Sequence, residues 1–167
     1  MRAVFGQALQ ALNRRGGQRA VGRERQRVGA GVAVLNGRGE VLLVRRADNG
    51  LWDLPGGGVN VGEEVGAAAR RELSEETGLR VGPLTLLGVF SGEAHRHSYP
   101  DGNVVAWVTV LYVARPVETQ SPENQPRAGD DAAQVAWWPL AALPGEVSAA
   151  GRVYFEALHA HLGREGT

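Results

Sequence analysis

The sequence predicts a single domain of mixed α and β structure. Its 167 residues are enough for one well-buried domain and too few to expect two. Valine-rich apolar runs at residues 28–36 and 103–114 are typical of strands. Residues 57–79 differ, because an alanine-rich segment there precedes acids at helical spacing and a glycine that can end a helix. Strands and helices therefore alternate along one chain.

The first 27 residues are predicted to stand apart from the domain. Apolar residues in the first turns can line one side of a short helix, and an arginine-rich stretch follows to residue 27. An arm that packs on the domain or on a second subunit, a disordered basic tail and an organellar transit peptide all fit this pattern. We therefore divide the chain into an N-terminal helix and basic arm at 1–27, a domain at 28–163 and a tail at 164–167.

Within the domain, five segments are predicted as strands: 28–36, 40–46, 80–90, 103–114 and 132–138. The Asn-Gly turn at 36–39 should join the first two as a hairpin. Polar loops are expected at 91–102 and 116–128.

Two further features complete the order of elements. Ser148 is placed to cap a C-terminal helix over 148–162. Trp52, just before the glycine run, is interpreted as a packing anchor rather than a base-stacking residue.

Composition excludes several kinds of chemistry. The chain has no cysteine, which removes disulfides and thiolate metal sites. It has no lysine, which removes the phosphate-binding P-loop and Schiff-base catalysis. Formal charge is balanced and no apolar run reaches the ~20 residues that span a bilayer, so a cytoplasmic protein without membrane or general nucleic-acid binding is expected. The arginine- and glycine-rich usage suggests a bacterial source.

The clearest chemical signal is a cluster of acids. Glu72, Glu75 and Glu76 are three and four residues apart, so on a helix they share one face. Crowded carboxylates repel unless a positive charge lies among them, and their oxygens suit Mg²⁺ or Mn²⁺. Neighbouring Arg71 can hold a carboxylate in a fixed orientation through its two-pronged guanidinium.

The flanks of the cluster fit a metal site on a helix. Residues 55–58 form a glycine-rich run that we expect to turn and to approach a ligand closely. Residues 62–64 place acids at the positive end of the helix, and Gly78 should end it.

These residues follow the order of a known signature. Gly57, Glu63, Arg71-Glu72-Leu73, Glu75-Glu76 and Gly78-Leu79 resemble the signature of the Nudix hydrolases, with every spacing kept. The resemblance covers 23 residues, 57–79. It implies an α/β fold of the Nudix type, an α/β/α sandwich with a mixed sheet between helices.

The resemblance also implies an activity and roles. Nudix hydrolases cut the pyrophosphate linkage of nucleoside diphosphate derivatives through metal-activated water. Glu72, Glu75 and Glu76 with the Gly57 carbonyl would hold Mg²⁺ or Mn²⁺, and Glu63 would support the loop or the metal. Arg71 would orient a glutamate, and Glu72 and Glu75 are the candidates for the general base.

Residues outside the signature are weaker candidates for substrate contact. Arg46 ends the second strand near the glycines, and His97 and Tyr99 lie in the polar loop. Each has an ordinary alternative, as a solvated charge or a turn residue. His95 and His97 could also bind zinc, but no third ligand is evident. Asp131 loosely matches a position where relatives often carry an acid, although turn chemistry explains it equally well.

Alternatives to hydrolysis stay open at this point. A Nudix-like module could bind or sense nucleotide without cutting it, although its signature would be expected to degrade. A structural domain with an acidic helix would bind no divalent cation. The basic arm is the one hint of an RNA substrate. A homodimer is also open, because many relatives are dimers.

Overall fold

A computed structural model describes residues 24–99, 101–117, 125–129 and 132–165. Two α-helices occur in this part of the chain, α1 (Val65–Thr77) and α2 (Ala149–Glu165), together with a short 3₁₀ helix, η1 (Glu93–His95). The strands are β1 (Glu24–Val34), β2 (Glu40–Arg46), β3 (Trp52–Asp53), β4 (Gly56–Gly58), β5 (Thr85–Phe90), β6 (Arg96–Ser98), β7 (Val104–Ala114) and β8 (Ala132–Pro139).

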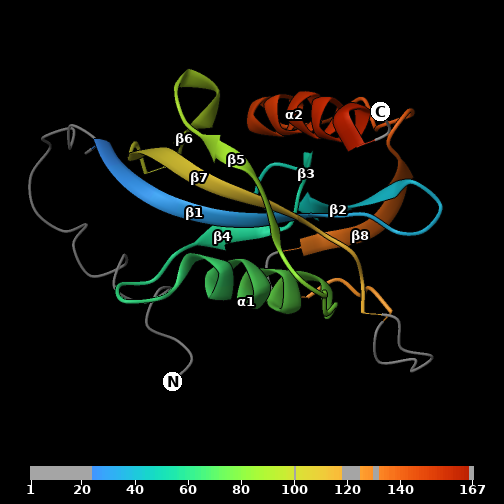
Figure 1. Ribbon diagram of the computed structural model, residues 1–167. Helices are drawn as coiled ribbons and strands as arrows, with labels where there is room; N and C mark the ends of the chain where they lie inside the picture. Colours follow the sequence, from blue (N-terminus) through green and yellow to red (C-terminus); the bar gives the residue numbers. More distant parts are fainter. Residues whose placement is uncertain (1–23, 100, 118–124, 130–131, 166–167) are drawn as a thin grey trace, which may run out of the picture.

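The strands form two sheets between the helices, as Figure 1 shows. The larger sheet has the order β4-β1-β7-β5, and β6 also pairs with β7. It is mixed, because β1 and β7 run parallel while the other pairs are antiparallel. The smaller sheet is antiparallel, in the order β3-β2-β8. With α1 on one side and α2 on the other, the predicted α/β/α sandwich is confirmed.

The alternation of side chains along β1 explains why both faces of the sheet are covered by a helix. On β1, Val32 and Val34 pack in a cluster with Ala69 and Leu73 of α1. Ala33, which lies between them, belongs to a second cluster that contains Phe155 and Leu158 of α2. Side chains of a strand point alternately to its two faces. The second half of β1 is apolar on both faces, so it is covered by a helix on each side.

Several local predictions were wrong in detail. The turn at 36–39 forms, but β1 and β2 enter different sheets and meet there only through a Leu35–Val41 bridge, so they are not a regular hairpin. The strand expected at 80–90 begins only at Thr85. The loop at 91–102 contains η1 and β6, because β7 is long enough to pair with a further strand. β1 begins at Glu24, four residues before the expected domain start.

The ends of the helices follow the sequence signals. The Glu64 carboxylate caps α1 by accepting from the backbone N–H groups of Gly66 and Ala67. Gly78 ends α1 in the left-handed conformation, with φ of 69°. The Ser148 hydroxyl accepts from the Gly151 N–H at 2.8 Å and caps α2, as predicted.

In the part of the chain that the structure describes, no helix has the length and apolar character that a membrane span requires.

Candidate active site

The predicted turn at 55–58 is instead strand β4, which lies directly against α1. Gly56, Gly57 and Gly58 pair with β1 in antiparallel register. A Cβ on Gly57 would overlap the Glu72 carboxylate, and one on Gly56 would lie 2.6 Å from the Ala30 carbonyl oxygen. Glycine is therefore required here for close approach rather than for a turn.

Arg71 is the centre of the acidic cluster. Its guanidinium donates to both carboxylate oxygens of Glu63, at 2.7 and 2.9 Å. It also donates to Glu72 at 2.7 Å, to Glu75 at 3.2 Å and to the Gly58 carbonyl at 3.0 Å. The Arg71 guanidinium thus links the β4 strand, the loop before α1 and two acids of α1. It supplies the positive charge that the crowded acids were expected to need.

Glu76 is the acid of this cluster that contacts the backbone of β4. Its carboxylate accepts from the Gly56 N–H at 2.9 Å. Burial raises the pKa of Glu76 to about 8, and the negative charge of Glu72 adds to the rise. Burial also raises the pKa of Glu72, against the opposing effect of its bond to Arg71. By contrast, hydrogen bonds from Arg71, then from the Asn60 N–H, lower the pKa of Glu63 to about 2.

This donor set suits a hard divalent cation. Carboxylates and a backbone carbonyl are the oxygen ligands such ions prefer, and the raised pKa values of Glu72 and Glu76 mark negative charge that a cation would relieve. Among the described residues, no three acidic or histidine side chains already converge on one point. Glu63, Glu72 and Glu75 are paired with Arg71 instead.

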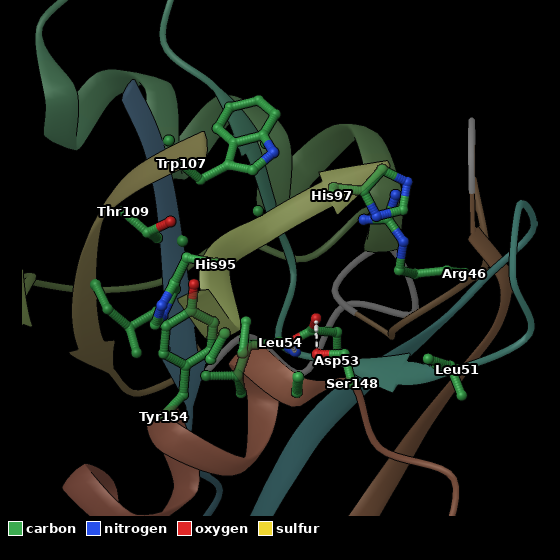
Figure 2. Close-up of a pocket in the computed structure, with 18 of the residues that line it drawn as sticks. Arg46, Leu51, Asp53, Leu54, His95, His97, Trp107, Thr109, Ser148 and Tyr154 are labelled. Carbon is green, nitrogen blue, oxygen red and sulfur yellow. Dashed lines mark hydrogen bonds between the residues drawn. The ribbon is translucent and has the colours of Figure 1, made fainter. Parts of the chain in front are cut away.

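A cavity of about 330 Å³ opens beside the glycine strand. Gly56 and Gly57 form part of its wall, and the same strand contacts Glu72 and Glu76, so β4 lies between the cavity and the acidic cluster of α1. Its other walls come from β1, β7, the η1–β6 segment and the start of α2, as the close-up in Figure 2 shows for the labelled residues. Such a cavity between sheet and helix, next to a set of charged groups, is a typical ligand site.

Three of the four predicted substrate contacts meet at this cavity. Arg46, His97 and Tyr99 all line it. Arg46 donates to both carboxylate oxygens of Asp48, at 2.9 and 2.8 Å, and the His97 ring packs edge-on against Tyr99, with ring centroids 4.5 Å apart. The fourth residue, Asp131, lies outside the described residues.

Other residues of the cavity were not predicted. Asp53 accepts from the Ser148 hydroxyl at 2.5 Å and from the Leu54 N–H at 2.8 Å, and burial raises its pKa. Tyr154 reaches the cavity from α2, where burial raises its pKa to about 12. An acid between Trp52 and Leu54 was a signal that could have been used, since a charge among buried apolar residues needs a partner.

His95 also differs from its expected setting. It was grouped with His97 in a polar loop, but it is only 5% exposed, and it lines the cavity from the end of η1. The two histidines therefore have different surroundings, and among the described residues no third ligand joins them in a group that could hold a metal ion.

The sequence of residues 25–158 matches the protein-family model that describes the NUDIX domain. The chain belongs to the Nudix family. This match covers the whole arrangement described above, from β1 into α2, and not only the signature at 57–79.

Individual Nudix relatives differ in the substrate that their names record. An RNA pyrophosphohydrolase of Bartonella bacilliformis is 32% identical over 159 residues, which cover 80% of this chain and 89% of that protein. An ADP-ribose pyrophosphatase of Methanocaldococcus jannaschii is 37% identical over 108 residues, 63% of this chain and 57% of that protein. The chain spans about half the length of several curated relatives that it matches.

A solved structure agrees with the fold. The MutT NUDIX hydrolase from Burkholderia pseudomallei is 31% identical, with a TM-score of 0.65 over 79% of this chain and 97% of that one.

Proposed function

We propose that this protein is a metal-dependent hydrolase that cuts the pyrophosphate linkage of a nucleoside di- or triphosphate derivative. The observation that carries the proposal is the intact Nudix cluster around Arg71, next to strand β4, which forms part of the wall of a cavity large enough for a small molecule. A module that only binds nucleotide has no need to keep every acid of the signature, so the complete set favours catalysis.

The ion implied by the family is Mg²⁺ or Mn²⁺. Glu72, Glu75 and Glu76, with the Gly57 carbonyl and with Glu63 in support, are the residues that would hold it. When bound, the ion neutralises phosphate charge and makes water a better nucleophile.

The protein's own residues supply positioning and proton transfer. Arg71 fixes the orientation of Glu63 and Glu72 through charge-assisted hydrogen bonds. Glu72 or Glu75 would accept the proton of the attacking water as general base. Arg46, His97 and Tyr99, with Asp131, are proposed to contact the substrate, since the three described ones share one wall of the cavity. Holding water and phosphorus in line accounts for much of the rate.

A panel of substrates tests the proposal. Nucleoside triphosphates, nucleotide sugars, ADP-ribose, dinucleoside polyphosphates, coenzyme A and 5′-triphosphorylated RNA would each be incubated with Mg²⁺ and with Mn²⁺. Hydrolysis of at least one, abolished by removing the metal, is expected, and release of phosphate or pyrophosphate locates the bond that is cut. Tight binding of a nucleotide with no turnover under any condition would instead support a sensor module.

RNA is included because one relative is named an RNA pyrophosphohydrolase and because the arginine-rich start of the chain is basic. If RNA is the substrate, its affinity should fall steeply with salt. We also propose a cytoplasmic location in a bacterium, and a homodimer would be tested by light scattering.

A further inference from the structure

His95 has a buried imidazole whose hydrogen-bonding capacity the fold does not use. The ring is stacked near Phe90, with centroids 6.3 Å apart, and lies 5.4 Å from the Tyr154 ring. Within the described chain, neither ring nitrogen has a well-formed hydrogen bond, and the Ser91 backbone interacts with the ring only weakly. Buried polar atoms are rarely left unpaired, because each costs the free energy of its lost hydration. Phenylalanine would satisfy the packing, so the nitrogens require another explanation.

The charge state of His95 is set by its surroundings. Burial lowers the pKa of the imidazole, against smaller opposing effects from the Ser91 carbonyl and Asp53. At neutral pH the ring is therefore uncharged, with one nitrogen as donor and the other as acceptor. A neutral ring of this kind matches an uncharged polar group on a ligand better than it matches a phosphate.

The wall of the cavity formed by β7 and β1 is suited to a flat ring. Trp107 and Thr109 of β7 line the same cavity, and Figure 2 shows them on its other side from Ser148 and Leu51. Beside them, Gly29 and Gly31 of β1 contribute no side chain, and a Cβ on Gly29 would come within 3.2 Å of the Trp107 ring. An aromatic face beside bare backbone favours stacking of a planar heterocycle.

The cavity extends from His95 to strand β4, which on its other side contacts Glu72 and Glu76 of the acidic cluster. We propose that His95 determines specificity by exchanging a hydrogen bond with the polar edge of the substrate's nucleobase, while the phosphates lie beside Gly57 and α1. This inference rests on the proposed function, and it adds the residue that distinguishes one base from another.

Binding of nucleoside monophosphates tests this role without catalysis. The affinities of AMP, GMP, CMP and UMP would be measured by calorimetry in the absence of metal, for the wild type and for His95→Phe. The wild type should prefer one base, and His95→Phe should bind that base about tenfold more weakly or worse, since a polar edge then loses its partner. The spread among the four ligands should shrink.

Controls separate recognition from folding. Ribose 5-phosphate, which lacks a base, should bind wild type and His95→Phe equally. His159→Phe, the same change at an exposed position of α2, should leave all affinities unchanged. Thermal unfolding of His95→Phe should occur at the wild-type temperature or above, because an unpaired buried group has been removed. His95→Gln, which keeps a donor and an acceptor, should retain a preference among the bases, and a second apolar variant, His95→Leu, serves as the readout if His95→Phe does not fold.

The result that overturns the inference is an unchanged set of four affinities in His95→Phe or, should that variant not fold, in His95→Leu. Failure of the proposed function looks different: no substrate of the panel would be cut by the wild type, while the preference among monophosphates would still depend on His95.

Discussion

The acidic cluster on α1 and the cavity beside α2 are built in opposite ways. The cluster is local, because Arg71, Glu72, Glu75 and Glu76 lie within six residues and a single helix sets their spacing. The cavity draws its walls from segments as distant as Gly29 and Tyr154. The difference teaches that this protein keeps its proposed chemistry in a short, rigid element and its proposed recognition in a long-range assembly. The two parts should therefore respond separately to mutation.

The largest effect is expected in the cluster. Glu76→Gln removes the negative charge but keeps an oxygen that can accept from the Gly56 N–H. Turnover should fall at least ~10²-fold, because a half-buried carboxylate that holds the cation is lost. Steady-state hydrolysis of the best substrate with Mg²⁺ measures this. Glu156→Gln, an exposed change on α2, is the control and should be as active as wild type. Full activity in Glu76→Gln, with unchanged circular dichroism, would remove Glu76 from the site.

Arg71→Lys is the next test, and it probes the organisation of the cluster rather than its ligands. Lysine keeps the charge but cannot bond both oxygens of Glu63 together with Glu72 and the Gly58 carbonyl. Residues that orient metal ligands typically contribute about 10- to 100-fold in metal affinity or activity. The Mg²⁺ concentration for half-maximal rate should rise within that range. Arg38→Lys, at an exposed turn, should leave it unchanged; an equal shift in both variants would argue against a positioning role.

The third prediction concerns pH and follows from the carboxyl of Glu76. Burial raises its pKa to about 8 from an ordinary value of 4.5, so between these pH values the folded protein holds a proton that the unfolded chain has released. The metal-free protein should therefore lose stability as pH rises from 4.5 through about 8. Because the proton must leave before a cation binds, Mg²⁺ affinity should rise with pH, by up to about tenfold per unit, and level off above pH 8.

Calorimetry of Mg²⁺ binding at pH 6, 7 and 8 measures this dependence. Repeating it in buffers of different ionisation enthalpy gives the number of protons released. Glu76→Gln should flatten the part of the slope that comes from this carboxyl. A proton release that is the same in wild type and variant would assign the effect to another group, of which Glu72, with its raised pKa, is the first candidate.

The same contrast explains what the sequence could predict. Spacing alone placed the acids on one face of α1. The helix begins after Glu64 and ends at Gly78, as the acids before it and the glycine after it predicted. The fold class followed from the signature and the apolar strands. The prediction of a turn at the glycines 56–58 was wrong. Glycine was taken to mark a turn, whereas here it allows β4 to lie against Glu72. Close approach between distant segments leaves no periodic signal in a sequence.

The cavity was predictable only in part, for a related reason. Arg46, His97 and Tyr99 were chosen because polar residues near the signature often face substrate, and they do share the cavity. His95 was treated like His97, since a chain of alternating polar residues gives no sign of which one a later helix will cover. α2 supplies Tyr154 beside His95, and that contact joins residues 59 positions apart in the chain. The role proposed for Asp131 stays a prediction.

The smallest effect is expected where the cavity is tied to α2. The Ser148 hydroxyl both caps α2, through the Gly151 N–H, and donates to Asp53. Ser148→Ala should lower the free energy of unfolding by about 1 to 3 kcal/mol, because the helix loses its cap and the buried Asp53 loses a hydrogen-bond donor. Urea denaturation measures this, and Ser74→Ala, an exposed position of α1, should change the free energy of unfolding by less than about 0.5 kcal/mol.

Since Mg²⁺ is proposed to bind at α1, its affinity should stay at the wild-type value in Ser148→Ala. A clear loss of Mg²⁺ affinity there would show that the two regions are coupled, and the separation drawn between them would fail.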